Sequence, residues 1–158
     1  MTVASVTKAL AVVVPVCVLA FAPVAWADGC KEFHADLVEH KSTQGCLNPA
    51  RSCFLGEVDG NHGLRGVTHF QGEEVRALPP GSPGWVSYSG FFHYTLEKGT
   101  LVARETGITN ASFVTAHHQI VDGTGAFAGA TGYFFVSGVK FDNGDTIFTR
   151  VTGELCMP

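Results

Sequence analysis

From Cys53 onward, apolar and polar residues alternate in short runs that are interrupted at short intervals by turn-forming residues. This is the pattern of antiparallel β-strands. Sustained apolar residues at helical spacing are absent, apart from a brief Phe33, Leu37, Val38 pattern near the start. The pattern predicts seven strands: Cys53–Val58, Gly63–Phe70, Trp85–Leu96, Thr100–Thr106, Ser112–Val121, Tyr133–Phe141 and Thr146–Leu155.

Three turn signals join neighbouring strands of this set. They are Asp59-Gly60-Asn61, Glu97-Lys98-Gly99 and Asp142-Asn143-Gly144-Asp145, and each offers a glycine for positive φ. Residues 71–84 are predicted to form a long loop with room for one more short strand at Glu74–Leu78. Seven or eight antiparallel strands in one small domain predict an all-β fold, a single closed eight-stranded barrel without exposed sheet edges.

The densest turn signal runs from Asp122 to Gly132, where glycines supply positive φ or close backbone approach. A phosphate-binding loop would need a following lysine and a helix start, whereas strand formers begin at Tyr133. The run is therefore predicted to be structural, with an apolar anchor at its only aromatic residue. The turn residues are Gly123, Gly125, Phe127, Gly129 and Gly132.

The first 27 residues are predicted to be an export signal that is removed from the mature protein. Lys8 is their only charge, an apolar stretch follows, and Ala25-Trp26-Ala27 has the small-x-small form of a cleavage site. The alternatives are a retained membrane anchor, which Pro15 and Pro23 disfavour, and a lipoprotein signal ending at Cys30. Either way, export is expected.

The mature part is expected to hold one domain of about 131 residues, enough to bury a core. Residues 28–51 are predicted to be an irregular arm with at most one helical turn, and 52–158 the barrel. The chain has a formal net charge of −4, which becomes more negative when Lys8 is removed. An acidic surface argues against nucleic acid or an anionic membrane as partner.

Of the five cysteines, Cys17 leaves with the signal and the other four are expected to form two disulfides in an oxidising compartment. Three pairings are possible. Because a closed barrel places the start of its first strand beside the end of its last, the prediction favours Cys53 with Cys156, and hence Cys30 with Cys46. Their spacing does not fit a zinc site. No metal or cofactor is predicted.

The segment Trp85–Cys156 resembles the allene oxide cyclase and dirigent type of barrel, including its small secreted bacterial members of unassigned function. The resemblance depends on the aromatic strand, the hairpin Lys98-Gly99-Thr100-Leu101 followed by Arg104-Glu105-Thr106-Gly107, the glycine run from Gly123, and the closing Val151-Thr152-Gly153-Glu154-Leu155-Cys156. It implies an eight-stranded barrel with a narrow, partly apolar lumen. Plant relatives hold a fatty-acid epoxide or a phenoxy radical there, and some bacterial relatives cyclise polyketides.

Strand alternation supplies candidates for a site in that lumen. Leu101, Ala103, Glu105 and Gly107 are predicted to face inward from one strand, and Val114, Ala116, His118 and Ile120 from the next. Glu105 and His118 would then face each other, either to bind or protonate a ligand or as a structural hydrogen-bonded pair. The family usually has an apolar residue at the position of His118. Tyr88, His93 and Arg150 are further candidates whose orientation the pattern does not fix.

Two functions follow from this sequence. The favoured one is a non-enzymatic exported barrel that binds a small apolar ligand or serves as a stable module, because the motifs are structural. The alternative, suggested by the resemblance, is a cofactor-independent cyclase or isomerase acting on a polyene, epoxide or polyketide-like substrate. A lumen filled by Phe92, Phe113 and Phe134 would argue against the enzyme. The oligomeric state stays open.

Overall fold

The structure is a computed structural model that describes residues 29–47 and 51–158. The predicted export signal and its cleavage site lie outside these residues. Within the described ranges, none of the helical segments has the length and apolar character needed to cross a bilayer as a helix.

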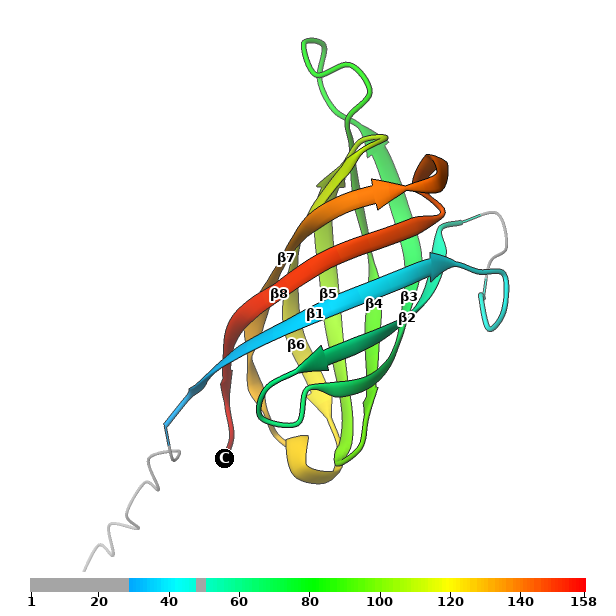
Figure 1. Cartoon of the computed structure of the whole chain (residues 1–158). Helices are drawn as coiled ribbons and strands as arrows, with labels where there is room; N and C mark the ends of the chain where they lie inside the picture. The colour runs from blue at the N-terminus through cyan, green and yellow to red at the C-terminus, as the bar shows by residue number, and fades with distance from the viewer. Residues whose placement is uncertain (1–28, 48–50) are drawn as a thin grey trace, which may run out of the picture.

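Eight antiparallel strands form a closed barrel, which confirms the predicted fold class (Figure 1). Each strand pairs with the next along the chain, and the last strand pairs with the first. Two short 3-10 turns lie between strands. The elements are β1 (Lys31–Lys41), β2 (Cys53–Gly60), β3 (Arg65–Ala77), β4 (Val86–Leu96), β5 (Gly99–Thr109), β6 (Phe113–Gly123), η1 (Gly125–Phe127), β7 (Thr131–Phe141), η2 (Asp142–Gly144) and β8 (Thr146–Cys156).

The eighth strand comes from the segment that was predicted to be an irregular arm, so that prediction is wrong. β1 pairs with both β2 and β8. Phe33, Ala35 and Leu37 are buried, while His34 and Asp36 between them are exposed. Such a short apolar run fits one helical turn as well as a strand by spacing alone. The strand prevails because it satisfies the hydrogen-bonding edges of two neighbours and closes the barrel.

The predicted extra strand at Glu74–Leu78 is not a separate element. β3 continues through it as far as Ala77, with an irregularity in its register to β4 between Gly72 and Glu74. The loop between β3 and β4 is correspondingly shorter than expected, and it projects beyond the barrel in Figure 1.

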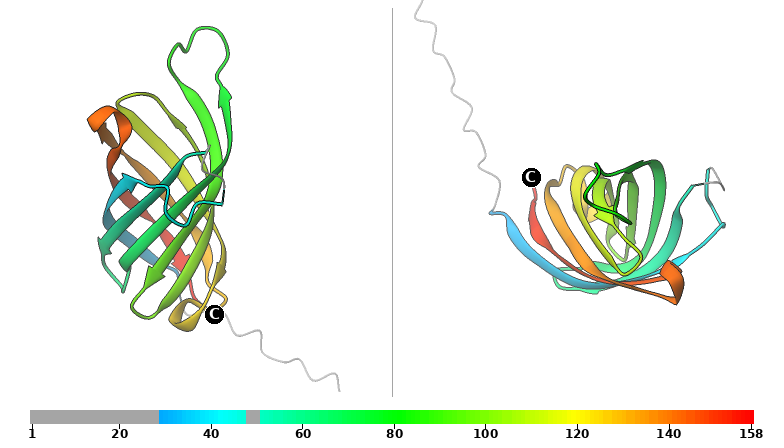
Figure 2. Two further views of the ribbon diagram at one scale, coloured as in Figure 1. Left: turned by 90° about the vertical axis from the view of Figure 1, so that its right-hand side faces the viewer. Right: turned by 90° about the horizontal axis from the view of Figure 1, so that it is seen from above.

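The two ends of the barrel differ. At one end the short β2–β3 and β4–β5 turns meet the η1 turn, and Leu64 and Phe127 from these turns are buried. Gly125 and Gly129 of the η1 region have φ of 61° and 72°, respectively. The other end, seen from above in Figure 2 (right), has the β1–β2, β3–β4, β5–β6 and β7–β8 connections. We call the first the closed end and the second the rim.

The four cysteines of the described chain form two disulfides, but in a different pairing from the predicted one. Cys30 is bonded to Cys156 and Cys46 to Cys53. The first strand does lie beside the last, as expected for a closed barrel. The predicted pairing is wrong because the first strand is β1 and not β2. Lys31 pairs with Leu155, so the cysteine just before β1 lies beside the end of β8.

Candidate functional site

The half of the lumen near the closed end is filled by side chains. Phe92 and Phe134 lie inside, as a filled lumen would require, whereas Phe113 is 53% exposed and lies outside. Six large side chains with at most 1% exposure form the centre of this packing: Phe33, Leu64, Tyr94, Leu101, Phe134 and Leu155. Their packing fills this half of the lumen.

The half of the lumen near the rim contains a cavity of about 250 Å³. Its wall is mainly apolar and includes Phe54, Phe70, Val114, Val136 and Ile147. Polar side chains interrupt this wall at a few points from β1, β4, β5, β6, β7 and β8. They include Glu39, Tyr88, Glu105, His118, Lys140 and Thr149, and Ser52, Glu74 and Thr109 also border the cavity. A concave apolar site with a few polar groups is the usual form of a small-molecule site.

Glu105 and His118 are brought together at the deep end of this cavity, because they are direct partners across β5 and β6. The His118 Nε2 atom lies 3.3 Å from Glu105 Oε2. On its other side, His118 Nδ1 shares a hydrogen bond of 2.7 Å with the Tyr94 hydroxyl, and the tautomer decides which atom donates. The Tyr88 hydroxyl donates to Glu105 Oε1 at 2.8 Å. Burial, and next the charge of Glu105, raise the pKa of both tyrosines, so they stay protonated.

Several buried polar atoms of this half of the lumen have no hydrogen-bond partner among the described residues. They are Glu105 Oε2, His118 Nε2, Thr68 Oγ1 and Thr149 Oγ1. Glu105 and His118 are therefore close, but their facing atoms are not aligned as a hydrogen bond. Buried polar groups are normally satisfied, so each exception requires an explanation such as a ligand or an ordered water.

A second carboxyl, Glu39 of β1, also borders the cavity. Burial, and then the charge of Glu105, raise its pKa well above the ordinary value of 4.5. Its strand partner Gly56 makes room for it, because a Cβ there would lie 2.8 Å from Glu39 Cγ and 2.7 Å from Thr68 Oγ1. A protonated carboxyl can donate a hydrogen bond to a ligand in an apolar site.

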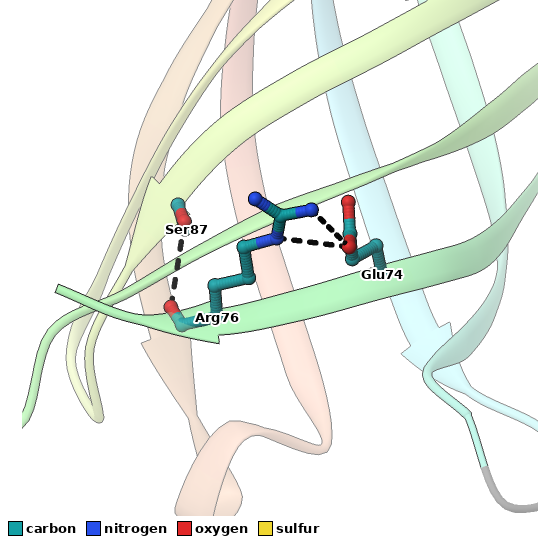
Figure 3. A network of polar contacts seen from close by, with 3 residues as sticks. All are labelled: Glu74, Arg76 and Ser87. Carbon is teal, nitrogen blue, oxygen red and sulfur yellow. Dashed lines mark hydrogen bonds and ion pairs between the residues drawn. The ribbon is translucent and has the colours of Figure 1, made fainter.

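Two charged side chains, Lys140 and Glu74, line the cavity near the rim. Lys140 of β7 donates hydrogen bonds to Thr109 Oγ1 at 3.2 Å and to the Asn110 carbonyl at 3.1 Å. Glu74 of β3 is held in turn by Arg76, whose Nε and Nη2 atoms both donate to Glu74 Oε1 (Figure 3). The charge of Glu74 is thus already paired.

The structure separates the five predicted lumen candidates into two groups. Glu105, His118 and Tyr88 line the cavity. Arg150 instead lies exposed on the outer surface, with its Nε 3.7 Å from Asp36 Oδ1. His93 also faces outward, beside His69 on β3, with the two ring centroids 6.4 Å apart. Alternation on β4 places Phe92 and Tyr94 inside and therefore His93 outside.

Four cavity or network residues were missing from the prediction: Glu39, Tyr94, Lys140 and Thr149. Glu39 was missed because its strand was expected to be an irregular arm. The alternation of Phe33, Ala35 and Leu37 with polar residues was the signal that would have placed Glu39 on the inner face. The position of Lys140 has no such signal, because it depends on the loop between β5 and β6 folding over its ammonium.

Two clusters of described residues have metal-ligating atoms close together: Cys46, Cys53 and His69, and Cys30, Glu154 and Cys156. In both clusters the sulfur atoms are joined in a disulfide, so neither provides the thiolates that a soft metal ion prefers.

Comparison with protein-family models and with curated proteins gave no match to this chain. The resemblance to the allene oxide cyclase and dirigent barrels therefore stays a prediction, and the function has to be argued from the cavity itself.

Proposed function

We propose that this protein is an exported barrel that binds a small, mostly apolar molecule in the rim half of its lumen. The observation on which the proposal depends is a cavity with an apolar wall and unpartnered buried polar atoms beside it. An apolar cavity of about 150 Å³ holds benzene. By that scale, 250 Å³ fits a molecule of about ten non-hydrogen atoms.

A stable module outside the cytoplasm is compatible with the same features. Two disulfides favour an oxidising compartment, and barrel closure leaves no sheet edge open to aggregation. The filled half of the lumen provides the rigid floor against which a ligand would rest.

An enzymatic role is the second candidate, and the Glu105–His118 pair supports it. The Glu105 carboxyl, the His118 imidazole and the protonated carboxyl of Glu39 border one cavity, and groups of these types can move a proton on a bound substrate. A cofactor-independent isomerisation or cyclisation would need no further group.

The test is native mass spectrometry of the protein purified from its own source, followed by titration of ligand-free protein with fluorescent 1-naphthol. We expect a co-purifying small molecule and saturable naphthol binding. Val136→Phe, which fills the cavity, should abolish binding, whereas Val139→Phe on the exposed face of β7 should leave it unchanged. Thermal melts would confirm that both variants are folded.

Equal naphthol affinity in wild type and Val136→Phe would show that binding occurs elsewhere and would overturn the proposal. Incubating the released ligand with fresh protein separates the two candidates. Isomerisation leaves the mass unchanged, so a new chromatographic retention time would indicate the enzyme and an unaltered ligand the binding protein.

A further inference from the structure

We propose that Lys140 is an anion-binding position at the rim, and that the ligand of the lumen is a singly charged amphiphile with its carboxylate on Lys140 and its apolar body inside the cavity. This inference rests on the proposed function and names the chemistry of its ligand.

Lys140 is a half-buried cation whose known contacts are all neutral. Its ammonium donates to the Thr109 hydroxyl and the Asn110 carbonyl, which leaves one of its three N–H donors free. Among the described residues, no carboxylate oxygen lies within the 4.0 Å of Lys140 Nζ that defines an ion pair. Partial burial also lowers the pKa of Lys140, because removal from water disfavours its charged form.

The neighbouring cations at the rim are different. Lys41 Nζ lies 3.2 Å from Asp145 Oδ1, and Arg76 holds Glu74. Of these three side chains, Lys140 is the one that lines the cavity and lacks an acidic partner. Charged groups that are partly removed from water normally acquire a partner. Lys140 lines the cavity, so a ligand bound there can accept a hydrogen bond from its free N–H.

The carboxyl groups around the cavity do not prevent an anion from binding at Lys140. Glu74 is paired with Arg76. Burial raises the pKa of Glu39 well above its ordinary value, which favours its neutral form. Glu105 belongs to the deep end. The Lys140 ammonium bonds to Thr109, which lies four residues from Glu105 on the same strand, β5. Four residues of strand correspond to ~13 Å.

The same spacing indicates the shape of the ligand. The cavity of about 250 Å³ is lined from Glu105 and His118 to Thr109 and Lys140, so a chain or a flat ring can contact both groups better than a globular body of the same volume. One ammonium with one free donor suits a single carboxylate. A phosphate dianion is usually held by several donors, and Lys140 stands alone at this position.

The experiment compares three probes of equal chain length, octanoate, octan-1-ol and octylammonium, by isothermal titration calorimetry on the full exported chain. We expect octanoate to bind about tenfold more tightly than octanol, as for one charge-assisted hydrogen bond, and octylammonium most weakly. Lys140→Met should remove the preference for octanoate and leave octanol binding unchanged. Lys41→Met, which removes a rim charge outside the cavity, should keep the preference.

Equal affinity for octanoate and octanol in the wild type would overturn the anion-binding role of Lys140 while leaving the proposed function intact. Failure of all three probes to bind would count against the proposed function itself. The comparison among probes uses the wild-type chain, so it decides the question even if Lys140→Met does not fold.

Discussion

At the residue scale, the lumen contains ionisable groups in an environment that disfavours charge. Glu39, Glu105 and His118 are each buried among aromatic and aliphatic side chains. Isolated buried charges are costly, so such groups are neutralised, paired or hydrogen-bonded. Glu105 has a tyrosine donor and a nearby imidazole, whereas Glu39 has no positively charged partner among residues 29–47 and 51–158, and its pKa is raised by burial.

Glu39 should make the barrel less stable as pH rises. Its pKa is raised in the folded state, so above its ordinary pKa of 4.5 the unfolded chain releases a proton that the folded chain keeps. Its contribution is complete below that pH and is lost progressively as pH rises toward the folded pKa, by about 1.4 kcal/mol for each unit of elevation. Glu39→Gln should therefore gain stability relative to wild type between pH 4 and pH 8, measured by urea unfolding.

Glu57→Gln is the matched control, because Glu57 is an exposed carboxyl on the neighbouring strand β2. It should give a stability curve parallel to that of the wild type. If the Glu39→Gln curve were also parallel, Glu39 would be ionised in the folded barrel and could not act as a hydrogen-bond donor to the ligand.

At the element scale, the η1 connection between β6 and β7 depends on backbone approach as well as on positive φ. Gly125 has φ of 61°, and a Cβ at this position would lie 2.3 Å from the Lys98 carbonyl oxygen of the β4–β5 turn. The Ala126 amide donates to that same oxygen at 2.8 Å. Two hairpin turns are thus locked together at the closed end, with Phe127 buried between them and the core.

Gly125→Val should consequently destabilise the barrel by about 2–5 kcal/mol, the sum of a left-handed backbone penalty and overpacking. Gly63→Val is a useful comparison, because Gly63 has φ of 89° but a Cβ there would meet only Lys98 Cδ, at 3.9 Å. We expect it to cost only the backbone penalty. Chemical denaturation would measure both, and equal losses would mean that the close approach to Lys98 contributes nothing.

Strand alternation predicted the inner and outer faces of some strands and not of others. On β5 and β6 one face is clearly more apolar, and Leu101, Ala103, Glu105, Ala116 and His118 are buried as that pattern indicates. On β4 and β8 apolar residues occupy both faces, so the pattern could not orient Tyr88, His93 or Arg150. The barrel leaves large hydrophobic residues exposed, such as Phe135 and Phe148, so the hydrophobicity of a residue is a poor guide to the face on which it lies.

At the scale of the whole molecule, closure depends on β1 meeting β8, and the Cys30–Cys156 disulfide fixes that meeting. These cysteines are 126 residues apart in sequence, whereas Cys46 and Cys53 are separated by 7. A cross-link restricts the unfolded chain more when it closes a longer loop. The two bonds should therefore differ in their effect on stability.

Replacing Cys30 and Cys156 together by serine should cost about 5 kcal/mol, and replacing Cys46 and Cys53 together about 2.5 kcal/mol, by loop entropy. Guanidinium unfolding of the two double variants would measure the difference. A larger loss in the Cys46/Cys53 variant would indicate that this bond has a structural role beyond loop closure.

The sequence by itself determined the all-β class, most strand positions, the hairpin turns and the inward faces of β5 and β6, because these depend on local alternation and on turn-forming residues. Only the tertiary structure decided that β1 completes the barrel, how the cysteines pair, and that Glu39, Thr149 and Lys140 meet Glu105 and His118 around one cavity. These features depend on strands distant in sequence becoming neighbours at a particular register, and a side chain's environment in a barrel is set by that register.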